Sequence, residues 1–154
     1  MSICDRIVVM KDGILQQIGK PQEVYDDPVN LFVATFLGTP PINVFDARVE
    51  GGKLWIGKEA VMDTTAPEGK VTAAIRPEGF DPDPEGSFTC GLNRVEVMGR
   101  DITVVATHPD CENTAIRAII PAENAVDAAS PTVSFALKPN KVFLFSRETE
   151  ARLL

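Results

Sequence analysis

The chain has 154 residues, of which 44% are hydrophobic and 24% charged, as is typical of one ordinary globular domain or two very small ones. Its 15 basic and 22 acidic residues give a net charge of −7, which argues against binding to nucleic acid or to an anionic membrane surface. Three widely spaced cysteines, the lack of a signal peptide and the lack of a long apolar run favour a soluble protein of a reducing compartment, by default the cytoplasm.

The first elements are short and have clear turn signals. Two apolar runs, 7–10 and 14–18, flank Asp12-Gly13, a pair that favours a β-hairpin because glycine readily adopts positive φ. Pro21 is suited to the first position of a short helix. Pro28 then opens a second helix, for which Asp27 is the expected N-cap.

The second predicted helix has a continuous apolar stripe. Apolar side chains recur there at helical spacing, and Gly38, Pro40 and Pro41 end the pattern. The stripe must pack on something, so its residues are candidates for an exposed stripe or an interface: Val29, Phe32, Val33, Phe36 and Leu37.

Beyond Pro41 the apolar pattern changes from helical to alternating. Eight short runs predict strands in a sandwich or small barrel, at 43–49, 53–56, 71–76, 87–98, 101–108, 114–120, 132–138 and 141–145. The stretch 121–129 is compatible with a short helix and equally with a loop or strand connection. We therefore divide the chain into segments 1–41 and 42–154.

Several motifs resemble catalytic or metal sites without completing them. The run 52–59 matches G-x-x-x-x-G-K but places Glu59 where a phosphate-binding loop needs a hydroxyl, so we expect a hairpin there. The sequence at 108–111 offers too few ligands for zinc and predicts a turn. A solvated acidic loop is expected at Asp81, Asp83 and Glu85. We assign no catalytic, cofactor-binding or metal-binding residue.

Arg76 follows an apolar strand and precedes Pro77-Glu78. An arginine buried there needs hydrogen bonds to carbonyls or to a carboxylate, because an unpaired guanidinium is costly to bury. A structural ion pair is therefore the favoured interpretation, and a role in binding a ligand or partner is the alternative.

Longer stretches resemble a known family. The run "CDRIVVMKDGILQQIGKPQEVYDDPVNLFVATFLGTPPIN" (4–43) closely resembles the end of the nucleotide-binding domain in the ATPase subunits of ABC importers for carbohydrates and related solutes, such as maltose and glycerol 3-phosphate. Four later motifs resemble that family's regulatory domain: "AAIRPEGF" (73–80), "VEVMGRD" (95–101), "IIPAEN" (119–124) and "FALKPNKVFLFSRETEARL" (135–153).

The resemblance implies a mainly β fold: an OB-type β-barrel, called a TOBE domain, over 42–154, preceded by a β-hairpin and two short helices from the end of a nucleotide-binding domain. Within its motifs, the candidate structural or regulatory residues are Arg76, Glu78, Glu96 and Gly99. The family's Walker A, signature and Walker B motifs and its switch histidine are not found in this sequence. The chain is therefore expected to be a fragment that does not hydrolyse ATP, with ATP and Mg²⁺ bound only by the intact subunit.

The function implied is that of a regulatory and dimerisation module in an importer of sugars or related solutes. Its expected partners are a second copy, the membrane-spanning permease subunits and, in some relatives, a cytoplasmic regulator. The expected location is the cytoplasm, at the inner face of the bacterial cell membrane. The alternatives are a TOBE module that binds a small oxyanion, and a docking platform for a regulatory protein.

Overall fold

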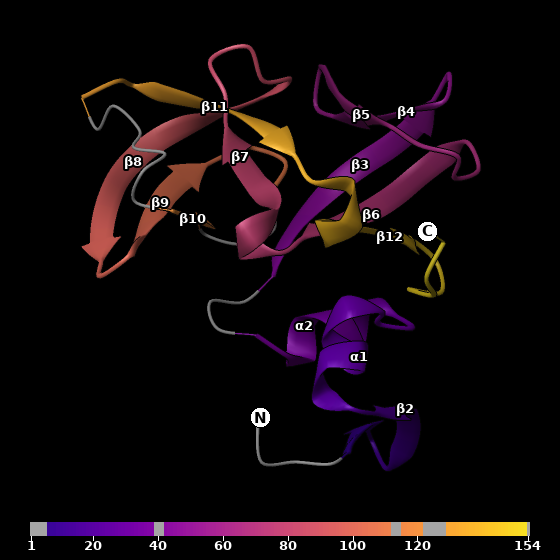
Figure 1. Cartoon of the computed structure of the whole chain (residues 1–154). Coiled ribbons are helices and arrows are strands. Elements are labelled where there is room, and N and C mark those ends of the chain that lie inside the picture. Colours follow the sequence, from indigo (N-terminus) through magenta and orange to yellow (C-terminus); the bar gives the residue numbers. More distant parts are fainter. Residues whose placement is uncertain (1–5, 39–41, 112–114, 122–128, 154) are drawn as a thin grey trace.

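The computed structural model describes residues 6–38, 42–111, 115–121 and 129–153. It contains a two-stranded hairpin, two short helices and two five-stranded antiparallel sheets (Figure 1). In Figure 1, helices α1 and α2 lie between the hairpin and the two sheets. No helix among the described residues is long and apolar enough to cross a membrane.

The hairpin pairs β1 (Ile7–Lys11) with β2 (Ile14–Gly19). Asp12 and Gly13 both have positive φ, 51° and 77°, as the type I′ turn of a two-residue hairpin requires. The predicted hairpin is therefore confirmed. Helix α1 (Pro21–Asp26) begins with its proline, also as predicted.

Helix α2 (Leu31–Phe36) begins later than the sequence predicted. Asn30 is its N-cap, because the side-chain oxygen accepts a hydrogen bond from the backbone N–H of Val33 at 2.9 Å. Asp27 instead ends α1, where its own N–H donates to the Glu23 carbonyl at 2.9 Å. The prediction of Asp27 as the N-cap was wrong, since this residue ends the preceding helix.

The β3 sheet has the strand order β12-β6-β3-β4-β5. Its strands are β3 (Asn43–Glu50), β4 (Lys53–Ile56), β5 (Glu59–Asp63), β6 (Gly69–Ile75) and β12 (Val142–Ser146). A 3₁₀ turn, η1 (Pro77–Gly79), follows β6, and another, η3 (Pro139–Lys141), precedes β12.

The β8 sheet has the order β10-β9-β8-β11-β7. Its strands are β7 (Phe80–Pro82), β8 (Phe88–Met98), β9 (Asp101–Thr107), β10 (Ile116–Pro121) and β11 (Thr132–Leu137). All eight predicted runs form strands, and within the described residues the strands that sequence reasoning missed are the short β5 and β7. The interpretation of 121–129 lies almost entirely outside the described residues.

One apolar core fills the space between the two sheets. Aromatic rings from both sheets meet there: the Phe45 and Phe88 centroids lie 5.4 Å apart, and those of Phe80 and Phe135 lie 5.1 Å apart. In β3, core residues alternate with exposed ones from Phe45 onward, as the period of two requires. This barrel-like arrangement confirms the mainly β, OB-type prediction.

Two smaller apolar clusters hold the N-terminal elements in place. Val9, Val24, Val33 and Leu37 form a cluster between the hairpin and the helices. A second cluster packs Ala34 of α2 onto the outer face of the β3 sheet, against Ile42, Val44, Ala74, Phe143 and Phe145. The helices therefore pack on the barrel itself as well as on the hairpin.

Candidate functional site at the joint between helices and barrel

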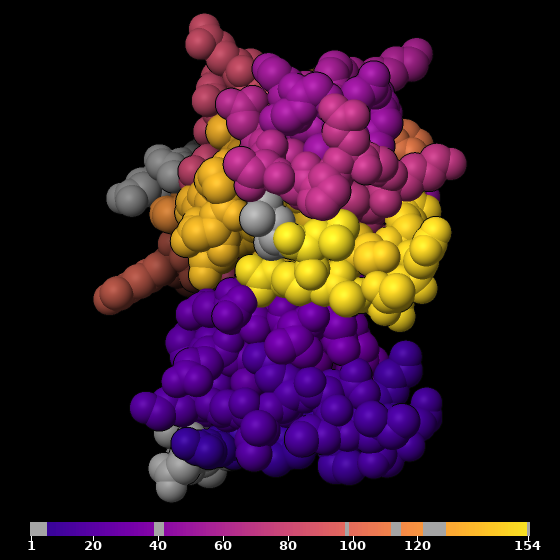
Figure 2. Space-filling view, turned by 90° about the vertical axis from the view of Figure 1, so that its right-hand side faces the viewer, coloured from indigo at the N-terminus to yellow at the C-terminus, as the bar shows by residue number. Residues whose placement is uncertain are grey.

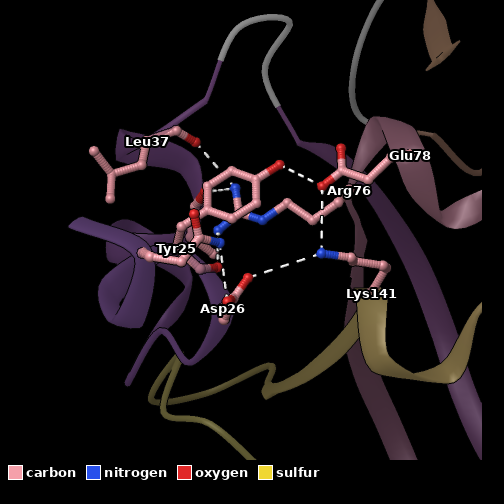
Figure 3. A network of polar contacts seen from close by, with 8 residues as sticks. Tyr25, Asp26, Leu37, Arg76, Glu78 and Lys141 are labelled. Atoms are coloured by element: carbon pink, nitrogen blue, oxygen red, sulfur yellow. Dashed lines mark hydrogen bonds and ion pairs between the residues drawn. The ribbon is translucent and has the colours of Figure 1, made fainter. Parts of the chain in front are cut away.

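Arg76 is the most buried polar feature where the helices meet the barrel. It directly follows β6, and only 1% of its surface is exposed. Its Nη1 donates to the carbonyls of Ala34 and Leu37, both at 3.0 Å, and its Nη2 donates to the carbonyl of Tyr25 at 2.8 Å (Figure 3). One barrel side chain thus bonds the C-terminal ends of both helices.

The acceptors explain why an arginine is suited to this position. The last carbonyls of a helix have no partner within the helix, and basic side chains commonly satisfy them. Burial lowers the pKa of Arg76 from its ordinary value, while the nearby Tyr25, Glu78 and Asp26 oppose that shift. A guanidinium nevertheless stays protonated in proteins. We call this contact region between the helices and the barrel the joint; it is centred on Arg76 and holds a permanent positive charge.

Tyr25 connects this guanidinium to the next acidic residue. The Cζ atom of Arg76 lies 3.9 Å from the centroid of the tyrosine ring, a cation–π contact. The Tyr25 hydroxyl donates to a Glu78 carboxylate oxygen at 2.6 Å (Figure 3). Burial, with the hydrogen bond to Glu78 second, raises the pKa of Tyr25 above its usual range, so the hydroxyl remains a donor.

Two ion pairs complete the network. The amino group of Lys141, in η3, lies 3.7 Å from the Glu78 carboxylate and 3.8 Å from that of Asp26 in α1. Both carboxylates are partly exposed, so these pairs contribute less than the buried hydrogen bonds. Together the contacts connect α1 and α2 with η1 and η3 of the barrel.

The C-terminal residues form a second connection, which we call the strap (150–153). The Glu150 carbonyl accepts from the N–H of Leu31 at 3.0 Å, and the N–H of Arg152 donates to the Val29 carbonyl at 3.0 Å. On its other side the strap bonds β12: the N–H of Leu153 donates to the Leu144 carbonyl at 2.7 Å. Figure 2 shows the yellow C-terminal stretch, which includes the strap, as a band between the barrel and the indigo N-terminal segment.

Arg152 anchors the strap through its side chain. Its guanidinium donates to the Asp27 carboxylate and, at 3.1 Å, to the Pro28 carbonyl. The Cζ atom also lies 4.7 Å from the centroid of the Phe143 ring. As at Arg76, an arginine on the barrel side bonds residues at the C-terminal end of a helix, here Asp27 and Pro28 after α1.

The structure brings only two of the four candidate regulatory residues together. Arg76 and Glu78 share the joint, whereas Glu96 lies on β8, 3.2 Å from Arg94 and 3.9 Å from Arg117. Gly99 forms the turn after β8 with a φ of 68°, which explains the glycine there without a ligand. Glu96 and Gly99 therefore belong to the β8 sheet rather than to the joint.

The apolar stripe is divided between buried and exposed positions. Val33 and Leu37 lie in the apolar cluster between the hairpin and the helices, and Phe32 packs against that cluster. Val29 is 45% exposed and Phe36 is 57% exposed. Only these two remain for contact with a further surface.

Sequence reasoning did not identify Tyr25, Lys141 or Arg152. Tyr25 is the only tyrosine in the chain, but its partner Glu78 lies 53 residues away. Arg152 lies 125 residues from Asp27. No local pattern marks contacts across such separations.

The remaining motifs have structural roles. The run 52–59 forms the end of one turn and the β4–β5 hairpin, as predicted. His108 begins the predicted turn, and its ring packs 5.1 Å from that of Phe88. Among the described residues no three histidine, cysteine or acidic side chains are grouped as a metal site would need.

Comparison with known proteins identifies the class of protein that this chain is similar to. The sn-glycerol-3-phosphate import ATP-binding protein UgpC of Jannaschia sp. is 30% identical over 156 residues, which cover 99% of this chain and 43% of that protein. The oligosaccharides import ATP-binding protein MsmX of Bacillus subtilis is 33% identical over 174 residues, or 99% of this chain and 46% of that protein. A scan against models of protein families found no match.

A third relative matches a shorter part more strongly. The lactose transport ATP-binding protein LacK of Rhizobium radiobacter is 40% identical over 121 residues, or 69% of this chain and 33% of that protein. The chain is thus homologous, along almost its whole length, to the ATP-binding subunits of ABC importers for sugars and sn-glycerol 3-phosphate, which confirms the resemblance. It spans less than half the length of these relatives.

Proposed function

We propose that the chain is the regulatory and dimerisation module of the ATP-binding subunit of an ABC importer for sugars or related solutes. In this proposal, segment 1–41 is the end of the nucleotide-binding domain and 42–154 is the TOBE domain. The rest of the subunit would bind ATP and Mg²⁺ and would contact the permease subunits at the cytoplasmic face of the membrane.

The observation that supports a regulatory role is the Arg76 joint. A buried guanidinium held by three helix carbonyls resists separation of the helices from the barrel, because separation would leave those groups without partners. The helices and the barrel would then move together as one rigid unit, so that a movement of the nucleotide-binding domain would also move the barrel. Contact between two barrels would in turn keep the two catalytic domains at a high effective concentration.

Sedimentation of the chain over a concentration series tests the dimerisation role. We expect a dimer in the micromolar range, and a monomer at high micromolar concentration would contradict the proposal. The double variant Val29→Asp with Phe36→Asp places charges at the two exposed residues of the apolar stripe and tests where the copies meet. A shift toward smaller species would assign the contact to the apolar stripe, whereas an unchanged dimer would assign it to the barrel.

Calorimetry tests the proposed lack of catalysis. The chain is expected neither to bind ATP at micromolar concentration nor to hydrolyse it, because the sequence contains no phosphate-binding loop followed by a helix. Saturable binding, or hydrolysis that Lys58→Ala abolishes, would contradict this expectation.

A further inference from the structure

A polar side chain is buried where the two sheets meet, at the start of β3. Asn43 is 1% exposed, and the alternation along β3 places it on the same face as Phe45, toward the β8 sheet. Burying an amide costs free energy unless it is hydrogen-bonded, so this position depends on its partners. Neither the function proposed above nor the relatives' names assign Asn43 a role.

The Asn43 side chain takes the place of a further strand beside β10. Among the described strands β10 pairs only with β9, so its other edge is free. On that edge the N–H of Arg117 donates to Asn43 Oδ1 at 3.0 Å, and Asn43 Nδ2 donates to the Arg117 carbonyl at 3.2 Å. A residue of a neighbouring antiparallel strand would make the same reciprocal pair of bonds. One side chain thus closes this edge of the barrel.

The same amide also bonds the end of β6. Asn43 Nδ2 donates at 3.2 Å to the carbonyl of Ile75, the residue opposite Asn43 in the β3–β6 ladder. The donor group and the acceptor oxygen of the side chain are therefore both in use. We call this contact of Asn43 with Ile75 and Arg117 the seam, because it connects β3, β6 and β10 across the two sheets.

The residues next to the seam hold helix α2. Ile42, directly before Asn43, packs with Ala34 of α2 in the cluster on the outer face of the β3 sheet. Arg76, directly after Ile75, donates to the Ala34 carbonyl at 3.0 Å. One peptide bond therefore separates each of these two seam residues from a residue that contacts the helix. A shift of α2 away from the barrel would displace both neighbours.

We propose that Asn43 couples the docking of the helices to the closure of the barrel at the free edge of β10. While the helices are docked, Ile42 and Arg76 hold the ends of β3 and β6 where the amide reaches Arg117. Separation of the helices would withdraw the amide and leave a backbone N–H and carbonyl of β10 without partners. Such coupling is reciprocal, so loss of the seam must loosen the helices by the same factor. The inference concerns contacts within the chain and does not rest on the proposed function.

Native-state hydrogen exchange of the full chain tests the coupling with the variant Asn43→Ala, which removes all three bonds. The Arg117 amide loses its acceptor and should exchange at least tenfold faster. The Ala34 amide, which donates to the Asn30 carbonyl, reports on α2 and should exchange at least fivefold faster. The Ala73 amide should not change, because β6 is paired on both sides there. A purely local role of Asn43 would leave Ala34 unaffected.

Two more variants separate the parts of the seam. Asn43→Asp keeps an oxygen that accepts from the Arg117 N–H but removes the donor to the carbonyls of Arg117 and Ile75. The Arg117 amide should therefore exchange more slowly in this variant than in Asn43→Ala, while Ala34 still exchanges faster than in the wild type. The matched control is Asn93→Ala, at an exposed asparagine of β8 whose side chain has no hydrogen bond to a described residue. It should leave all three amides unchanged.

Each outcome decides the proposal. Wild-type exchange of the Arg117 amide in Asn43→Ala would show that the amide does not close the edge. Faster exchange of Arg117 with unchanged exchange of Ala34 would show that the edge and the helices are independent. Equal acceleration of Arg117, Ala34 and Ala73 in both Asn43 variants would show that Asn43 supports the whole barrel. Any of these three results would overturn the coupling, and the expected pattern in both variants would establish it.

Discussion

Replacing Arg76 with methionine should loosen the helices from the barrel while leaving the barrel folded. Methionine keeps the length and apolar bulk of the side chain but provides no donor for the carbonyls of Tyr25, Ala34 and Leu37. The two strands beside Arg76 are unaffected, because β6 pairs with β3 and β12 through backbone groups.

The size of the effect follows from these contacts. A hydrogen bond to a charged group contributes about 1.5–3 kcal/mol, and a buried acceptor left without a partner costs about 1–3 kcal/mol. The three carbonyls share one guanidinium and gain access to water when the helices open, so their energies do not add fully. We therefore expect the free energy of opening of the helices to fall by roughly 3 kcal/mol, or about 100-fold in the opening equilibrium.

Native-state hydrogen exchange measures this opening directly. The amides of Val24 and Ala34 report on the helices, because they donate to the carbonyls of Lys20 and Asn30 within each first turn, both at 3.1 Å. Amides of β3 and β6 report on the barrel. Helix amides should exchange about 100-fold faster in the variant, and barrel amides should not change.

The matched control is Arg94→Met, which removes an exposed arginine from a surface pair with Glu96. Such changes usually alter stability by less than about 0.5 kcal/mol. Arg76→Lys should give an intermediate result, since lysine cannot reproduce the fork of the guanidinium. If the helix amides of Arg76→Met exchange at the wild-type rate, the argument that Arg76 holds the joint is refuted.

Three further predictions concern the strap, the tyrosine and a buried thiol. Tyr25→Phe removes the hydroxyl that donates to Glu78 and should lower the free energy of unfolding by about 1 kcal/mol in urea titrations; an unchanged midpoint would contradict this. Arg152→Ala should release the strap from Asp27, so that the N–H of Leu31, which donates to the strap, exchanges about tenfold faster; equal exchange would show that the backbone contacts suffice. Burial raises the pKa of the Cys90 thiol from 9.0 to about 12, so the folded state retains a proton that the unfolded chain loses, and stability should fall as the pH rises from 9 toward 12. Cys90→Val should show a flatter decline over that range, and a decline as steep as that of the wild type would refute the assignment to this thiol.

The sequence by itself predicted the elements whose signals are local. The Asp12-Gly13 turn depends only on two adjacent residues that adopt positive φ, and the strands depend on apolar residues at alternate positions. The short β5 and β7 were missed because their few residues show no clear alternation, and they become strands only by pairing with β4 and β11. The N-cap of α2 was misplaced because Asp27 and Asn30 are both suitable capping residues and lie only three positions apart. The side chain of Asn30 also donates to Gln16 of β2, a contact that the local sequence does not show.

The joint and the strap were decided only by the tertiary structure. The sequence indicated that Arg76 needs buried partners, but its acceptors lie 39, 42 and 51 residues away and are backbone carbonyls, which any residue supplies. Periodicity reports which face of a strand is buried, whereas the partners of a polar group depend on which distant segments pack together, and no local pattern specifies that packing.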